Sequence, residues 1–226
     1  MSDSTTERAL IVGASGGIGA ALATRLRGQG AEVVALSRSA DGLDVTDEDS
    51  VSRLVGALDG PFDLIVVTTG ALRIDREGPE KSLRDLDAGA LARQYALNAI
   101  GPALVLKHAL PLMPRDRRAV FAALSARVGS IGDNGLGGWY GYRAAKAGLN
   151  QLLHTAAIEV ARTHPQAICA ALHPGTVQTD LTRKYLGRHP AVPPDEAAGN
   201  LMTVLAGLRA EDTGGFFDWR GDRVPW

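Results

Sequence analysis

The sequence of 226 residues has a single cysteine, no excess of charge of either sign and no long hydrophobic run. The lone Cys169 excludes an internal disulfide, and its apolar surroundings at residues 167–172 indicate a buried structural thiol in a reducing compartment. A formal net charge of −1 argues against a nucleic-acid partner. No segment reaches the roughly 18 apolar residues of a membrane helix, and residues 1–8 lack the order of a signal peptide. We therefore expect a cytoplasmic protein with no membrane partner.

The sequence also has no pattern of metal ligands and no repeat. None of its five histidines has a convincing spacing with a cysteine or a carboxylate, so no metal site is predicted. The histidines interpreted as structural or solvated are His108, His154, His164, His173 and His189. A hydrophobic content of 45% is enough for one full core, and we expect a single domain over residues 1–226.

Short apolar runs alternate with helical patterns along the chain, which is typical of an α/β fold. Strands are expected at residues 9–12, 32–36, 62–67, 119–124, 167–172 and 215–219. Helices are expected at residues 20–27, 46–58, 83–113, 137–162 and 194–208. Together they predict a Rossmann-like, doubly wound parallel sheet of six or seven strands with helices on both faces.

The chain leaves little room for a crossover after the second strand. Parallel neighbours are normally joined by a dozen or more residues, but only five separate Arg38 from Asp44. We therefore expect no helix there and a short or vestigial third strand at residues 44–45. Thr46 is expected to cap the next helix, with Asp49 three residues later. Pro102 is expected to kink the helix at residues 83–113.

A glycine-rich turn, GASGGIG at residues 13–19, stands between the first expected strand and the first helix. Glycines allow a tight turn and the close approach of a pyrophosphate. The following helix offers its free N–H groups to the phosphates. A tight turn without a ligand is the alternative, but the order strand, turn, helix favours a dinucleotide site.

The end of the second strand indicates which dinucleotide binds. An acidic residue there would accept the ribose 2′-hydroxyl of NAD. The chain has Ser37 and Arg38 instead, and a guanidinium pairs well with a 2′-phosphate. We therefore predict NADP(H) in preference to NAD(H), the alternative being a solvated arginine.

Tyr142 and Lys146 are four residues apart in the expected helix at residues 137–162, and they therefore share one face of it. A phenol of ordinary pKa, about 10, is a poor acid–base catalyst at neutral pH. A nearby ammonium lowers that pKa, and a phenol so tuned can exchange a proton with a carbonyl/alcohol pair. An exposed pair without a function is the alternative for this short pattern.

Taken in order, these motifs resemble the short-chain dehydrogenase/reductase family over essentially the whole chain, and residues 125–150 resemble its carbonyl-reductase branch. Gly13, Gly17 and Gly19 match the nucleotide glycines, and Tyr142 and Lys146 match the catalytic pair. The further matches are Asp44 and Val45 at the adenine, Asn98 in a helix, and the loop Pro174, Gly175, Val177 and Thr179 beside the nicotinamide. The remaining cofactor contacts that the resemblance implies are Ser15, Ile18, Ser37, Arg38, Thr69 and Gly70.

The resemblance also implies a mechanism in which NADPH delivers hydride to a carbonyl carbon. Tyr142 would protonate the oxygen, and Lys146 would hold the ribose and lower the pKa of Tyr142. Asn98 would anchor a water in a proton relay. The hydroxyl of Thr179 would meet the carboxamide of the nicotinamide, and a serine would hydrogen-bond the carbonyl.

Three departures from the family pattern bear on this mechanism. The family usually has two adjacent serines after the fifth strand, the second of them catalytic, but here Ser125 is followed by Ala126. Either Ser125 or Ser130 would have to serve. Thr68 and Thr69 replace the asparagines that usually precede Gly70. Gly16 stands where many NADP-dependent members have a basic residue, so the cofactor prediction depends on Arg38.

Three functions fit these observations. The first is an NADPH-dependent reductase that converts an aldehyde or ketone to an alcohol. The second is an NADP-binding sensor or signalling protein with little turnover, and the third is an epimerase or lyase of the same fold. The resemblance implies a homodimer or homotetramer through the helices at residues 83–113 and 137–162. It also implies a substrate lid at residues 180–193, with Tyr185 and Leu186 as candidate lid residues.

Overall fold

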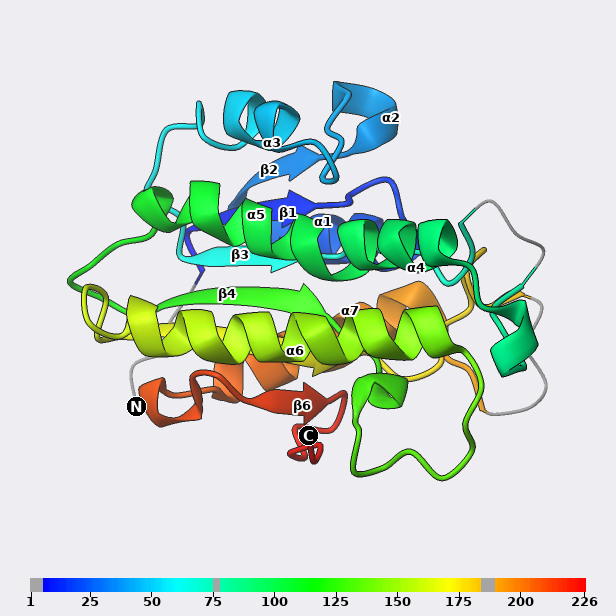
Figure 1. The fold of residues 1–226 in the computed structure, drawn as a ribbon. Helices are drawn as coiled ribbons and strands as arrows, with labels where there is room; N and C mark the ends of the chain where they lie inside the picture. The colour runs from blue at the N-terminus through cyan, green and yellow to red at the C-terminus, as the bar shows by residue number, and fades with distance from the viewer. Residues whose placement is uncertain (1–5, 75–77, 184–189) are drawn as a thin grey trace.

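The computed structural model describes residues 6–74, 78–183 and 190–226, and their centre is a parallel sheet of six strands in the order β2-β1-β3-β4-β5-β6 (Figure 1). The strands are β1 (Arg8–Val12), β2 (Glu32–Leu36), β3 (Leu64–Val67), β4 (Ala119–Leu124), β5 (Ala167–His173) and β6 (Phe216–Asp218). The α-helices are α1 (Gly17–Gly28), α2 (Arg38–Asp41), α3 (Glu48–Leu54), α4 (Ala88–Tyr95), α5 (Gly101–Ala109), α6 (Tyr140–Val160) and α7 (Pro194–Gly207). Short 3-10 turns lie at Leu83–Asp85, Leu110–Leu112, Arg127–Gly129 and Ala210–Asp212. The predicted α/β fold class is confirmed.

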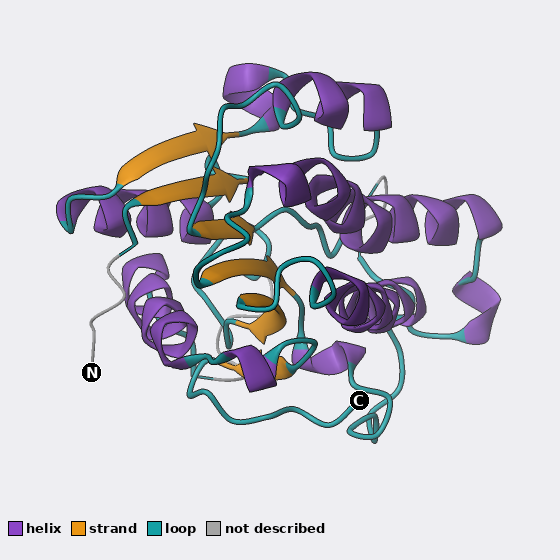
Figure 2. Cartoon of the chain, turned by 90° about the vertical axis from the view of Figure 1, so that its left-hand side faces the viewer, coloured by secondary structure: helices purple, strands orange, loops and turns teal. Residues whose placement is uncertain are grey.

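Helices cover both faces of the sheet because the strands are apolar on both sides (Figure 2). Leu10 and Val12 belong to the core beneath α3, α5 and α6. Ile11, which points the opposite way in the pleat, belongs to the core beneath α1 and α7. Figure 1 accordingly shows α5 and α6 in front of the sheet and α1 and α7 behind it. Cys169 is fully buried in β5, as predicted.

The chain after β2 differs from the prediction in three details. Residues 44–45 form no strand, so the vestigial strand is absent from the six-stranded sheet. The single turn α2 occupies residues that were expected to contain no helix. The next helix begins at Glu48 with Asp47 as its cap. Thr46 does not cap it, because the Thr46 hydroxyl donates to Asp44 at 2.7 Å.

The expected helix at residues 83–113 begins only at Ala88 and contains a π-helical turn just before Pro102. Between α4 and α5 the backbone widens into a π-helical turn at Ala96–Ile100, and Pro102 falls in the first turn of α5. Proline has no N–H and cannot donate to the carbonyl four residues before it, which here is that of Asn98. A wider turn accommodates this missing bond, and π-turns are frequent at functional sites.

Candidate active site

The glycine turn after β1 leaves the start of α1 open to a ligand. The N–H groups of Gly13 and Ala14 both donate to the carbonyl of Leu36, and Gly13 has a φ of 91° that favours glycine. Helix α1 has neither a side-chain cap nor an acidic residue in its first turn. The N–H groups of that turn have no intrahelical partners. They can therefore donate to the phosphates of a dinucleotide, as the sequence predicts.

Thr68 holds this turn against the end of β3. Its hydroxyl donates to the carbonyls of Val12 and Gly13 at 3.0 and 3.1 Å. Gly19 approaches the same place so closely that a Cβ there would lie 2.5 Å from the Gly13 oxygen. Thr68, which replaces an asparagine of the family pattern, therefore still forms hydrogen bonds to the glycine turn. Thr69, in contrast, has a buried hydroxyl without a hydrogen-bond partner among the residues that the structure describes, which suits contact with a cofactor.

The loop after β5 closes against the glycine turn. A Cβ on Gly17 would lie 3.0 Å from the Thr179 methyl group, so the two predicted cofactor segments meet there. Gly175, which follows Pro174, has a φ of 77° and lies against the indole of Trp219. Val177 is buried in the loop, and its carbonyl accepts from the Thr182 hydroxyl.

The end of β2 presents the guanidinium of Arg38. Arg38 is exposed and its guanidinium has no hydrogen bond or ion pair among the described residues, although its charge helps to lower the pKa of the Asp44 carboxyl. The Ser37 hydroxyl is occupied, because it caps α2 by accepting from Ala40 and also contacts Asp41. Val45 is packed against Gly101 and contributes to the core. Asp44 is half-buried, and hydrogen bonds from Thr46 hold the pKa of its carboxyl below the usual value.

Tyr142 and Lys146 lie one turn apart on α6, and both are buried, with 8% and 2% of their surfaces exposed. The Lys146 ammonium donates to the carbonyl of Leu124 at 2.7 Å and lies 5.8 Å from the centroid of the Tyr142 ring. Burial lowers the pKa of Lys146 to about 7 and raises the pKa of Tyr142 to about 12. The predicted lowering of the Tyr142 pKa is therefore wrong for the protein alone, because loss of water outweighs the neighbouring cation.

Asn98 joins this pair from the π-turn, with its side chain fully buried. Its Oδ1 accepts from the N–H of Ala71, and its Nδ2 donates to the Ala71 carbonyl and to Oε1 of Gln94 at 2.7 Å. A Cβ on Gly70 would lie 2.9 Å from this Oδ1 and 3.4 Å from the Lys146 ammonium. The structure thus brings Asn98, Gly70 and Lys146 together. The side-chain amide of Asn98 forms hydrogen bonds with the backbone of Ala71, in the segment that follows β3.

Each candidate serine already has a partner. Ser125 follows β4 directly, and its hydroxyl donates to Oδ1 of Asn150 at 2.7 Å. The Ser130 oxygen accepts from the N–H of Asp133 at 3.1 Å. Both side chains are buried, and the methyl group of Ala126 offers no hydrogen bond. Ser130 keeps its own proton available for donation, whereas the Ser125 proton is committed to Asn150.

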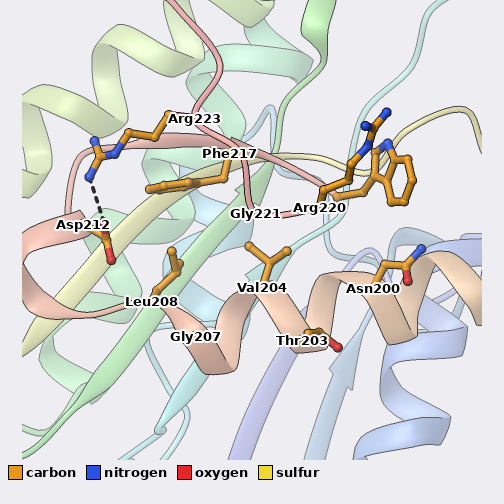
Figure 3. Close-up of a pocket in the computed structure, with 11 residues that line it drawn as sticks. Asn200, Thr203, Val204, Gly207, Leu208, Asp212, Phe217, Arg220, Gly221 and Arg223 are labelled. Atoms are coloured by element: carbon orange, nitrogen blue, oxygen red, sulfur yellow. Dashed lines mark hydrogen bonds and ion pairs between the residues drawn. The ribbon is translucent and has the colours of Figure 1, made fainter.

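A cavity of about 420 Å³ adjoins Gly70 and is lined also by Ala71, Leu72, Arg73 and Leu181. A second cavity, of about 530 Å³, lies between α7 and the chain around β6, and none of the motif residues lines it (Figure 3). The smaller cavity is the better candidate for a substrate because Gly70, which lines it, lies close to Asn98 Oδ1 and the Lys146 ammonium. The predicted lid residues Tyr185 and Leu186 lie outside the described residues.

Comparison with known proteins identifies the family of the chain. Residues 13–201 match a protein family described as enoyl-(acyl carrier protein) reductase. A 1-hydroxy-2-glutathionyl-2-methyl-3-butene dehydrogenase from Rhodococcus sp. is 31% identical, over 96% of this chain and 98% of its own length. The chain belongs to the short-chain dehydrogenase/reductase family. It is an NAD(P)-dependent oxidoreductase with a small-molecule substrate.

Two further proteins resemble the chain in sequence or in fold. The C-signal protein of Myxococcus xanthus is 32% identical, over 74% of this chain and 94% of its own. An NADPH-bound carbonyl reductase from chicken fatty liver has the same fold, with a TM-score of 0.83 at 23% identity, covering 98% of this chain and 99% of that one. No helix among the described residues is long and apolar enough to cross a membrane. No cluster of potential metal ligands occurs in that part of the chain either.

Sequence reasoning missed two residues that shape the site, Gln94 and Glu80, and identified Thr68 only as a departure from the family pattern. Thr68 secures the glycine turn. Gln94 connects Asn98 to the Leu72 carbonyl at 3.1 Å. Glu80 is buried beside the first turn of α6, although it lies 62 positions before Tyr142 in the chain. The sequence shows Glu80 only as one carboxylate in a charged loop between two predicted elements. That position does not distinguish it from the exposed charged residues around it.

Proposed function

We propose that the protein is an NADPH-dependent reductase of an aldehyde or ketone, with Tyr142 as the proton donor. The observation that supports this most is the convergence of Tyr142, Lys146 and Asn98 near Gly70, which itself lines a cavity. NADPH, when bound, supplies the hydride. Burial raises the pKa of Tyr142 to about 12 in the protein alone, so the phenol is protonated at neutral pH. Efficient proton transfer requires that the charge of Lys146 lower this pKa when the cofactor is bound.

Each of the other residues has a place in this proposal. The first-turn N–H groups of Gly17, Ile18 and Gly19, with Gly13 and Ser15 in the turn, hold the pyrophosphate. Lys146, protonated, binds the ribose hydroxyls and stabilises negative charge on the phenol oxygen. Ser130, or Ser125 after release from Asn150, donates to the carbonyl oxygen of the substrate. The Thr179 hydroxyl binds the carboxamide of the nicotinamide.

Oxidation of NADPH, followed by its absorbance, tests the proposal against a panel of aldehydes, ketones, quinones and 3-oxoacyl thioesters. A glutathionyl aldehyde belongs in the panel, because the Rhodococcus relative is named for a glutathionyl alcohol. Turnover of one class supports a reductase. Firm NADPH binding without turnover of any compound supports the sensor instead, for which Ala126 and the occupied Ser125 are the specific observations.

We expect Arg38→Ala to weaken NADPH binding about tenfold to a hundredfold and to leave NADH unchanged. A charge-assisted hydrogen bond contributes about 1.5–3 kcal/mol, and each 1.4 kcal/mol is tenfold in affinity. Dissociation constants of both cofactors, measured by fluorescence titration, check this. Arg53→Ala removes another exposed arginine, on α3, and serves as the control. Equal losses for NADPH and NADH would contradict a contact with the 2′-phosphate.

We expect NADPH binding to take up close to one proton above pH 7. The amine of Lys146 has a pKa of about 7 in the protein alone, and the negative charge of the cofactor favours the ammonium. Below pH 7 the amine is charged in both the free protein and the NADPH complex, so the affinity for NADPH does not change with pH. Above pH 7 affinity should fall, by at most about tenfold per pH unit. Calorimetric titration in buffers of different ionisation enthalpy measures the uptake. The Lys146→Met variant should lack it, and zero uptake by the native protein at pH 8 would contradict the assignment.

A homodimer or homotetramer is part of the same proposal. Four large apolar side chains on or beside α4, the π-turn and α6 are between 38% and 56% exposed: Tyr95, Ile100, Leu152 and Ile158. These elements lie on the same face of the sheet, and their exposed apolar groups support contact with a second subunit there.

A further inference from the structure

Helix α6, which carries Tyr142 and Lys146, begins without a cap of its own. Its N-cap residue is Trp139, which has a φ of 55° and no side-chain cap bond. No acidic residue stands in its first turn. Gly137 and Gly138, just before it, also have positive φ values, of 64° and 67°. A helix start that is left to itself has several N–H groups without partners and tends to fray.

Glu80 supplies the missing cap from a distant part of the chain. Its backbone carbonyl accepts from the N–H of Trp139 at 2.6 Å. Its carboxylate accepts from the N–H of Gly141 at 3.3 Å. Only 5% of Glu80 is exposed. One residue thus serves two N–H groups at the start of α6, and its negative charge stands at the positive end of the helix.

The fit around the carboxylate is close. A Cβ on Gly141 would lie 3.0 Å from the second carboxylate oxygen of Glu80 and 3.3 Å from the side chain of Gln94. The carboxylate is therefore held where α4 meets the first turn of α6. Gln94 is also the residue that binds Asn98, and Tyr142 directly follows Gly141. Glu80 thus lies beside Gly141, which precedes Tyr142, and beside Gln94, which binds Asn98.

We propose that Glu80 is a positioning residue, which fixes the first turn of α6 and thereby the hydroxyl of Tyr142 relative to Lys146 and Asn98. The inference rests on the proposed role of Tyr142. A misplacement of reacting groups by about 1 Å can cost a hundredfold in rate. The first turn of α6 is the part of the helix least constrained by the sheet, because the longer remainder packs on the core through Leu149, Leu153 and Val160.

The test compares Glu80→Ala with Glu80→Gln, whose amide oxygen can still accept from Gly141. Asp47→Ala is the control, since it removes a side-chain cap from α3, where Asp47 accepts from Asp49. In Glu80→Ala we expect amide hydrogen exchange at Gly141 to accelerate at least about tenfold. We also expect kcat to fall about tenfold with the KM for NADPH unchanged. Glu80→Gln should restore both values to within about threefold, and Asp47→Ala should change neither.

Two results would overturn the inference: a Glu80→Ala enzyme with native kcat, or a Glu80→Gln enzyme as impaired as Glu80→Ala. Should Glu80→Ala fail to fold, Glu80→Asp replaces it, because its shorter side chain withdraws the carboxylate from Gly141. The measurement of amide hydrogen exchange does not depend on turnover. An unchanged exchange rate at Gly141 in Glu80→Ala would by itself refute the role of Glu80 as the cap of α6. If Tyr142→Phe proves fully active while exchange responds as expected, the proposed function fails and the cap stands.

Discussion

Tyr142→Phe should lose about 10²- to 10⁴-fold in turnover, the range that general acid catalysis contributes, while NADPH binds as before. The substitution removes one oxygen and keeps the ring in its buried position on α6. Among the residues that the structure describes, none receives a hydrogen bond from the Tyr142 hydroxyl. The folded state therefore loses no internal bond, and the loss should lie in the chemical step.

Tyr140→Phe is the matched control, because Tyr140 begins the same helix two residues earlier. It should retain native turnover. NADPH oxidation on the best substrate of the panel, together with a separate NADPH titration, distinguishes loss of chemistry from loss of binding. Full activity of Tyr142→Phe would exclude it as the proton donor. Loss of activity without net NADPH consumption by the native protein would indicate an epimerase or lyase that uses the same phenol.

The sheet and the glycine turn were predictable because their signals are local. Apolar runs such as the one at β4 gave correct strand bounds, since a strand buried on both faces must be apolar throughout. The strand–turn–helix order around Gly13 likewise depends only on neighbours in the chain. The position of Lys146 one turn after Tyr142 follows from helical geometry alone. These features needed no knowledge of tertiary contacts.

The features that were missed or wrong depend on tertiary contacts. The cap of α6 comes from Glu80, in a loop that sequence patterns did not connect with the helix. The pKa of Tyr142 is set by how deeply the ring is buried, and the pattern Tyr-x-x-x-Lys does not encode that depth. The π-turn at Ala96–Ile100 depends on Asn98 reaching across to Ala71. The sequence predicted a helix with a kink at Pro102 there, and no π-turn.

Asn98→Ala should destabilise the protein by about 3 kcal/mol, because it leaves several buried polar groups without partners at about 1–3 kcal/mol each. The N–H and carbonyl of Ala71 and the Oε1 of Gln94 would all lose their bonds to the amide. For a chain of this length such a loss lowers Tm by about 6–12 °C. Urea unfolding and calorimetry measure the change. Asn134→Ala, which removes a single exposed bond to Gly137, should cost less than about 1 kcal/mol.

This prediction separates two roles for Asn98. The sequence suggested an anchor for a relay water, but the side-chain amide is already engaged by Ala71 and Gln94. If the side chain acted in the relay, Asn98→Ala would lose activity at native stability. If the side chain instead holds the backbone of Ala71, as its hydrogen bonds show, Asn98→Ala should lower both stability and activity, because Gly70 would no longer be held beside Lys146.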